Sequence, residues 1–127
     1  MNLHSNSEDE FHNMLIFQWK GTYIRPHKHL YKPETCHMLE GKQQQILLGD
    51  NGEVIDRANL STNENIIYRI QSNTYHTAFI LSDYVLFHES KPGPFLFDED
   101  SIFPRWAPNS NQKEIDTFMN NIFDENL

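Results

Sequence analysis

Short runs of apolar and β-branched residues, separated by turn residues, follow one another from residue 14 to residue 90. Runs of this length and spacing are typical of an antiparallel β-sandwich or barrel. Asn51-Gly52 adds a hairpin signal, because this pair readily adopts the positive φ angles of a tight turn. The run that contains Pro26 is expected at a sheet edge or a bulge. The predicted strands are 14–19, 22–29, 34–40, 43–48, 53–60, 66–71, 75–81 and 84–90.

The pattern changes after Pro94, and the last part of the chain predicts one short helix. Four apolar residues recur there with the i, i+3, i+4, i+7 spacing of a helix face; they are Ile115, Phe118, Met119 and Ile122. Asn111 followed by Glu114 resembles a capping box, which marks a helix start. We predict a helix at about 110–123, packed on the outside of the barrel.

Composition places the chain among globular proteins with one core. The 127 residues are 38% hydrophobic and 13% aromatic, which argues against disorder. We expect a single domain over 1–127, with the barrel at 14–91 and the tail and helix at 92–127. The uncharged stretches are too short to span a bilayer, and the start of the chain has no signal-peptide pattern, so we expect no membrane insertion.

Charge and cysteine content narrow the partners and the compartment. The net charge is −8 and the basic residues are scattered singly, so nucleic acid is not expected as a partner. The only cysteine is Cys36, which excludes a disulfide framework and makes the reducing cytoplasm the expected compartment. Seven histidines in a chain of this length give the first indication of chemistry.

Residues 21–41 contain a constellation of metal-ligand types. His27 and His29 are two residues apart, so on a strand both imidazoles leave the same face. Glu34 follows a turn and can return its carboxylate to that face, while Gly21 and Gly41 stand at the flanking turns. Two neutral imidazoles and one carboxylate on one face suit a divalent transition metal. Surface histidines with a solvated glutamate are the alternative.

His76 is the best candidate for a fourth ligand from a distant strand. The hairpin formed by 43–48 and 53–60 can bring it to the same inner wall; a buried histidine satisfied by the core is the alternative. Three histidines and one glutamate leave open positions on a six-coordinate ion. We therefore predict one divalent metal per chain, and iron, manganese, nickel and zinc all accept this donor set.

The spacing Gly21-x5-His27-x-His29-x4-Glu34-x6-Gly41 is similar to the first signature motif of the cupin superfamily at all five positions. The second motif retains only His76: Gln71, Asn73 and Ile80 stand where that family has proline, glycine and asparagine. Asn73 can adopt the left-handed conformation of a glycine. The resemblance implies an all-β fold, a cupin jelly-roll β-barrel or sandwich with a short C-terminal helix.

A resemblance to the WbuC family of cupin-fold metalloproteins covers nearly the whole chain. The segment Gly21–His29 looks like that family's GTYVRPHRH, and Tyr75-His76-Thr77 looks like its WHT. Similar stretches are Asn2-Leu3-His4, residues 89–95 and residues 103–108. The resemblance implies a small metal-binding barrel from a gene for cell-surface polysaccharide synthesis. It implies no settled reaction.

Three further residues are candidates for the pocket. His88 and Glu89 alternate, so only one faces inward, and we favour Glu89 as a proton-transfer residue because it lies with Lys91 in the WbuC-like segment. A solvated Glu–Lys pair is the alternative. Arg25 alternates with the metal-site histidines and can meet an anionic ligand, or it points outward. We name Glu89 as the catalytic candidate and Arg25 and Lys91 as substrate-pocket candidates.

Three functions remain open for this site. The chain is an enzyme of isomerase or lyase type acting on a small sugar-derived molecule, or an iron-dependent dioxygenase, or a non-catalytic metal-dependent binding or sensor module. The expected partner is a small-molecule ligand such as a carbohydrate. Unpaired sheet edges and the aromatic-rich tail also predict a homodimer.

Overall fold

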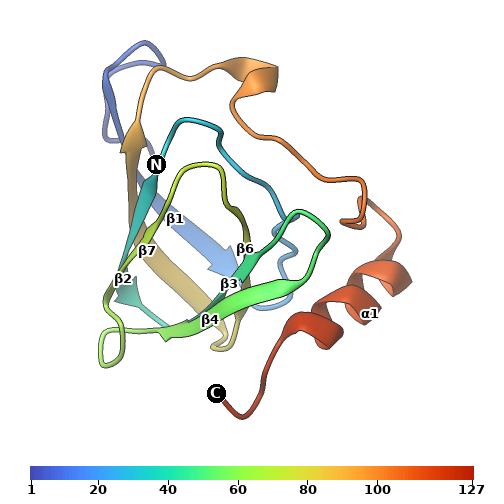
Figure 1. The fold of residues 1–127 in the computed structure, drawn as a ribbon. Helices are drawn as coiled ribbons and strands as arrows, with labels where there is room; N and C mark the ends of the chain where they lie inside the picture. The colour runs from blue at the N-terminus through green and yellow to red at the C-terminus, as the bar shows by residue number, and fades with distance from the viewer.

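Two antiparallel sheets face each other in the computed structural model, which describes residues 1–127 (Figure 1). The first sheet has the order β1-β7-β2-β5, and the second has the order β4-β3-β6. The strands are β1 (Phe11–Trp19), β2 (Glu34–Glu40), β3 (Gln43–Leu48), β4 (Val54–Leu60), β5 (Ile67–Ile70), β6 (Tyr75–Ile80) and β7 (Tyr84–Pro92). The 3-10 turn η1 (Phe97–Glu99) and the helix α1 (Gln112–Ile122) complete the chain. The predicted fold class, a β-sandwich with a short C-terminal helix, is confirmed.

Residues 22–29 differ from the expectation, because they form no strand. Pro26 lacks a backbone N–H and cannot donate to a ladder. The segment is instead extended and held by two isolated bridges, His27 with His76 and Lys28 with Ile102. The two metal-candidate histidines therefore sit on an irregular segment that is anchored at two neighbouring residues.

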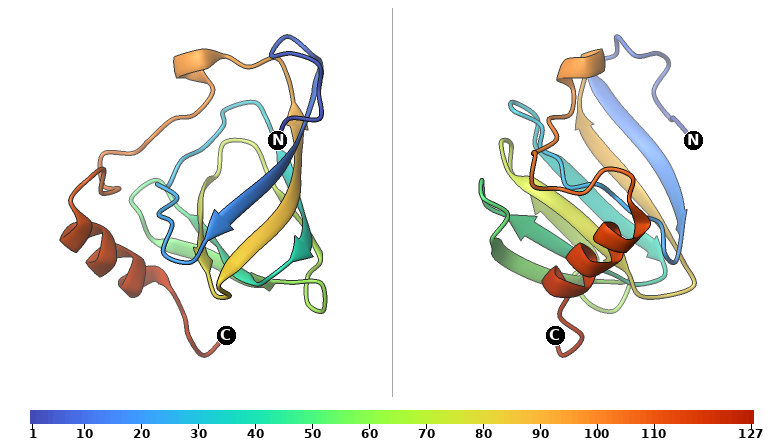
Figure 2. Two further views of the ribbon diagram at one scale, coloured as in Figure 1. Left: turned by 180° about the vertical axis from the view of Figure 1, so that it is seen from behind. Right: turned by 90° about the vertical axis from the view of Figure 1, so that its right-hand side faces the viewer.

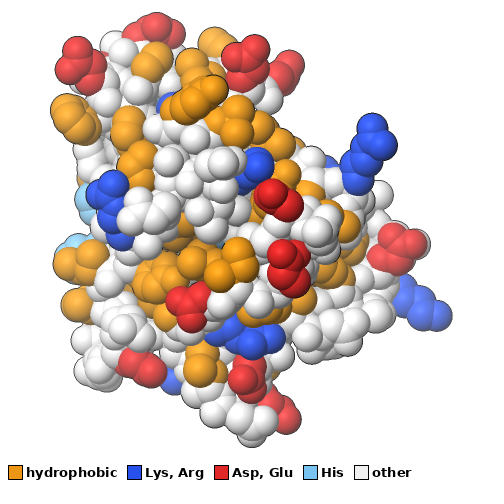
Figure 3. Space-filling model, viewed as in Figure 1, with side chains coloured by type: hydrophobic (Ala, Val, Ile, Leu, Met, Phe, Trp, Pro, Cys, Tyr) orange, Lys and Arg blue, Asp and Glu red, His pale blue; other side chains and the backbone are white.

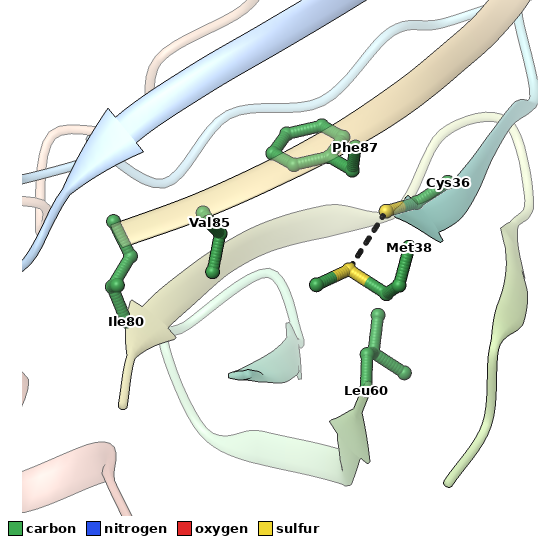
Figure 4. Close-up of a cluster of buried hydrophobic side chains, with 6 residues drawn as sticks. All are labelled: Cys36, Met38, Leu60, Ile80, Val85 and Phe87. Carbon is green, nitrogen blue, oxygen red and sulfur yellow. Dashed lines mark hydrogen bonds between the residues drawn. The ribbon is translucent and has the colours of Figure 1, made fainter. Parts of the chain in front are cut away.

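The core lies between the two sheets and is made of inward-facing apolar side chains (Figure 4). Alternation places one set of residues from each strand on this inner face. The cluster contains Cys36, Met38, Leu60, Ile80, Val85 and Phe87. The Cys36 Sγ lies 3.8 Å from Met38 Sδ. This core fills one end of the sandwich.

Helix α1 covers the outer face of the three-stranded sheet, as Figure 2 shows. Its buried residues Ile115, Met119 and Ile122 pack on outward-facing residues of β3 and β6. The helix starts at a cap, because Asn111 Oδ1 accepts a hydrogen bond from the Glu114 backbone N–H at 3.0 Å. No helix in the structure has the length and apolar character that crossing a membrane requires.

The outer face of the four-stranded sheet carries an exposed aromatic group. Phe17 and Trp19 on β1 pack with Tyr84 on β7, and Trp19 is 63% exposed. The free edge of β1 is partly paired by the start of the chain, through Leu3 N–H to Asn13 O and Leu15 N–H to Met1 O. The expected homodimer stays a prediction.

Candidate metal centre

The bridge between His27 and His76 brings the candidate ligands together. The His27 N–H donates to His76 O at 3.2 Å, and the His76 N–H donates to His27 O at 2.9 Å. The centroids of the two rings lie 4.5 Å apart. Asn73, in the left-handed conformation with φ 59°, donates its N–H to His29 O at 2.6 Å and so holds the other end of the segment. The left-handed conformation expected at Asn73 is confirmed.

Glu34 is the first residue of β2 and faces two of the three rings. Its Oε2 lies 3.2 Å from His29 Nε2, and its Oε1 lies 3.0 Å from His76 Nε2. His29, Glu34 and His76 are all buried. The structure thus gathers the four predicted ligand residues at one place inside the sandwich.

Backbone carbonyls determine the tautomer of all three imidazoles. A carbonyl oxygen can only accept, so the Nδ1 beside it carries the hydrogen and Nε2 of the neutral ring has a free lone pair. The three Nδ1 contacts are His27 to Arg25 O at 2.9 Å, His29 to Asp100 O at 2.6 Å and His76 to Thr74 O at 2.9 Å. Such carbonyl partners are typical of metal-binding histidines.

The Nε2 lone pairs of His29 and His76 face the carboxylate of Glu34, which also offers only lone pairs. A cation, either a proton or a metal ion, is needed between these groups. His76 Nε2 is a buried atom whose geometry toward Glu34 makes no hydrogen bond. Ligand atoms of His27, His29 and His76 all lie within 4.8 Å of one another. The three histidines could hold a metal ion, and the orphaned nitrogen of His76 fits that role.

Burial and mutual charge shift the pKa values of the cluster in different directions. Burial and the neighbouring His76 lower the pKa of His27 to about 4. Burial opposes the charged forms of Glu34 and His76. The contacts with His29 and His76 nevertheless hold the pKa of Glu34 well below its usual range, and the Glu34 carboxylate raises the pKa of His76. His27 is therefore neutral and available as a ligand throughout the physiological range.

Protons should compete with a metal ion at fewer than three imidazoles. Because the pKa of His27 is about 4, this ring takes up no proton between pH 7 and pH 5. The raised pKa of His76 means that its proton must leave when a metal binds, so affinity falls as the pH drops through that pKa. We expect the dissociation constant of the metal to rise by at most about a hundredfold for each pH unit of acidification, because at most two protons compete with the ion. Metal-competition titrations from pH 7 to pH 5 measure this slope, and a thousandfold change per unit would contradict it.

A cavity of about 160 Å³ adjoins the cluster and contains Glu89. The other ionisable residues on its wall are His27, Glu34, Cys36 and His76. Burial, reinforced by the charge of Glu34, raises the pKa of Glu89 to about 7. Burial likewise raises the pKa of Cys36 to about 12, so this thiol is neutral. His88 points elsewhere, with Nε2 3.1 Å from Asn13 Oδ1.

Arg25 and Lys91, the expected substrate contacts, are not among the residues that line this cavity. The Arg25 guanidinium lies 4.9 Å from the centroid of the Phe103 ring, and its Nη2 lies 3.5 Å from the carbonyl oxygen of Pro104. Lys91 Nζ lies 3.4 Å from Asp100 Oδ2. Arg25 and Lys91 therefore both contact the C-terminal segment, because the chain passes back over one end of the barrel after residue 94.

Sequence reasoning missed Asp100 and Lys32, which support the cluster from outside. Lys32 Nζ donates to Asp100 Oδ1 at 2.5 Å, and both side chains are buried. This ion pair holds the segment whose carbonyl at Asp100 accepts from His29 Nδ1. The two residues are 68 positions apart, and no local pattern marks either of them.

Comparisons with known proteins agree with this fold. Residues 1–60 match the family model of a domain of unknown function, DUF6016. No curated protein sequence matches the chain. Among solved structures, the capsular polysaccharide assembling protein CapF from Staphylococcus aureus superposes with a TM-score of 0.67 at 18% identity. The match covers 76% of this chain and 29% of the CapF chain.

Two further solved structures have a fold similar to that of this chain. Oxalate decarboxylase from Bacillus subtilis has a TM-score of 0.61 at 14% identity, over 76% of this chain and 24% of that chain. Procruciferin, an 11S globulin of Brassica napus, has a TM-score of 0.57 at 11% identity, over 73% of this chain and 22% of that chain. The chain has the cupin fold. At these identities the likeness shows the fold alone, and the chain spans less than a third of each of these proteins.

Proposed function

We propose that this chain is a metal-dependent enzyme of the WbuC type that acts on a small sugar-derived molecule. The observation that carries the proposal is the position of Glu89, which shares one cavity with His27, Glu34 and His76. In the metal-free protein, burial and the charge of Glu34 raise the pKa of this carboxyl to about 7. A bound divalent cation would favour the ionised form, so Glu89 would enter the reaction as a base and carry the proton between its two transfers.

The metal would be held by His27, His29, Glu34 and His76, three nitrogen donors and one carboxylate. This set suits one divalent ion of iron, manganese, nickel or zinc. When bound, the ion would act as a Lewis acid on a carbonyl or hydroxyl oxygen of the substrate. The carbonyl contacts at Nδ1 orient all three rings for this role.

Glu89 would move the proton. In its ionised form it accepts a proton from the carbon next to a substrate carbonyl, and in its protonated form it returns that proton to a neighbouring carbon or oxygen. The apolar side chains of Ile16, Ile24 and Phe87 line the same cavity. This is the chemistry of an isomerase or lyase.

A place in cell-surface polysaccharide synthesis and in the cytoplasm completes the proposal. It is supported by the WbuC-like segment Gly21–His29, which contributes two of the ligands, and by the shared fold with a capsular polysaccharide assembling protein. Nucleic acid is no part of the proposed activity. On the face shown in Figure 3, acidic side chains are spread widely and basic ones form no continuous patch.

Proton exchange with solvent tests this function directly. Metal-loaded protein in D₂O is expected to exchange the hydrogen next to the carbonyl of glyceraldehyde or erythrulose, as followed by proton NMR. Glu89→Gln should keep its metal and slow the exchange by at least about a hundredfold, the usual contribution of a general acid–base residue. Metal-loaded protein that exchanges no faster than metal-stripped protein would argue against an enzyme of this class.

A further inference from the structure

The cavity beside the metal cluster is lined by three glutamines, an unusual content for the interior of a small barrel. Gln43 and Gln45 point inward from β3, and Gln18 joins them from β1. Gln43 is 2% exposed and Gln45 is 4% exposed. Amide groups at such depth normally find hydrogen-bond partners, so any that lack them require an explanation.

Two of the amide oxygens on this wall lack a partner, whereas the nitrogens of Gln43 and Gln45 have one within the protein. Gln45 Nε2 donates to Thr77 O at 2.9 Å, and the Thr77 hydroxyl donates to Ile24 O. Gln43 Nε2 lies 3.9 Å from Cys36 Sγ. The Oε1 atoms of Gln18 and Gln43 are buried with no hydrogen-bond partner. The wall therefore calls for a ligand that brings donors.

The unpartnered amides start from backbone positions remote from the histidines and reach back toward the cluster. Gln43 pairs with Ile80, four residues along β6 from His76, and Gln18 pairs with Val85, four residues along β7 from Glu89. The Gln43 amide extends to within 3.9 Å of Cys36 Sγ, and Cys36 stands opposite Glu89 on the neighbouring strand. A ligand with one end at the metal would direct its other end toward these amides.

Charge and size restrict the ligand further. No lysine or arginine lines the cavity, so nothing there balances a phosphate or carboxylate remote from the metal. The volume is about 160 Å³, and a cavity of about 150 Å³ accommodates one benzene molecule with its six carbon atoms. The space therefore suits a molecule of about six to eight non-hydrogen atoms and excludes a whole nucleotide sugar.

We propose that this cavity binds an uncharged polyhydroxy carbonyl compound of three or four carbons, whose hydroxyl groups donate to Gln18 and Gln43. The carbonyl end would lie toward the histidines and the hydroxyl end toward the amides. The inference rests on the proposed function, which puts the reacting end at the metal cluster. It adds the class of substrate: neutral, rich in hydroxyl groups, and neither phosphorylated nor acidic.

Calorimetric titration of protein loaded with Zn²⁺ tests the ligand class without relying on turnover. The probes are erythrulose, UDP-glucose and erythrose 4-phosphate, which carries its charge at the end remote from the carbonyl. Erythrulose is expected to bind at least tenfold more tightly than the phosphate. UDP-glucose tests whether the sugar end of a larger molecule can enter, and equal or tighter binding of UDP-glucose would overturn the size limit.

Two substitutions on adjacent residues of β3 provide a matched comparison. Gln43→Leu removes an amide whose oxygen has no partner, so it should weaken erythrulose binding about tenfold and leave the melting temperature unchanged or higher. Gln44 faces the other way, donating to Asp124 O at 2.9 Å and to Asn59 Oδ1 at 3.1 Å. Gln44→Leu should lower the melting temperature and leave the affinity for erythrulose unchanged.

The outcomes separate the ligand class from the proposed function. Protein that holds its metal but binds erythrulose no better than erythrose 4-phosphate, or binds it equally well as Gln43→Leu, overturns the ligand class and leaves the metal centre standing. Protein that binds erythrulose equally with and without metal supports the ligand class and contradicts the metal-dependent function.

Discussion

Replacing His76 with alanine is expected to remove stoichiometric metal binding. The His76 Nε2 is buried without a hydrogen bond, 3.0 Å from Glu34 Oε1, so in the folded protein it is placed to serve as a ligand. Loss of a residue that merely supports a ligand typically weakens metal affinity by 10–100-fold. Loss of the ligand itself should exceed a hundredfold, as measured by metal content after purification and by competition with a chelator.

Melting temperature gives a second reading of the same change. Metal that binds only the folded state stabilises it by about 4 kcal/mol when present at a thousand times its dissociation constant. A chelator should therefore lower the melting temperature of the unsubstituted protein and leave that of His76→Ala nearly unchanged. His37→Ala is the matched control, since His37 stands on β2 but does not line the cavity. A full equivalent of metal in His76→Ala would show that the four-ligand assignment is wrong.

Replacing Glu89 with glutamine is expected to stabilise the metal-stripped protein at alkaline pH while it removes the proposed activity. The pKa of Glu89 is raised from 4.5 to about 7 by burial and by the charge of Glu34. A carboxyl whose pKa is raised on folding makes folding less favourable as the pH rises above the unfolded pKa of 4.5, because the unfolded state ionises first; the full penalty is present above about pH 7. The shift corresponds to about 3 kcal/mol.

The size of this stabilisation depends on pH, which makes the test specific. At pH 8 Glu89→Gln should raise the free energy of unfolding by about 3 kcal/mol, and near pH 4.5 the gain should vanish, because glutamine resembles the protonated carboxyl. Urea unfolding at both pH values measures the difference, with the exposed Glu8→Gln as control. An equal gain at both pH values would indicate altered packing and not relief of a buried charge.

Local patterns predicted much of the fold because they depend on neighbouring residues only. Short runs bounded by turn residues gave β2 and β3 their observed bounds, and the helical spacing of Ile115, Met119 and Ile122 located α1 to within two residues. The exception is the segment at Pro26, where the apolar pattern suggested a strand but the missing N–H prevents a ladder.

The candidate site was likewise predicted only in part from the sequence. By itself the sequence determined the types and spacing of His27, His29 and Glu34, because a two-residue interval and a turn decide which side chains can meet. Only the tertiary structure decided that His76 pairs with His27, that Glu89 shares their cavity, and that Arg25 turns away toward Phe103. The pairing of Lys32 with Asp100 likewise joins residues 68 positions apart. Such partners are selected by the packing of two whole sheets and the returning C-terminal segment, and no stretch of sequence contains that information by itself.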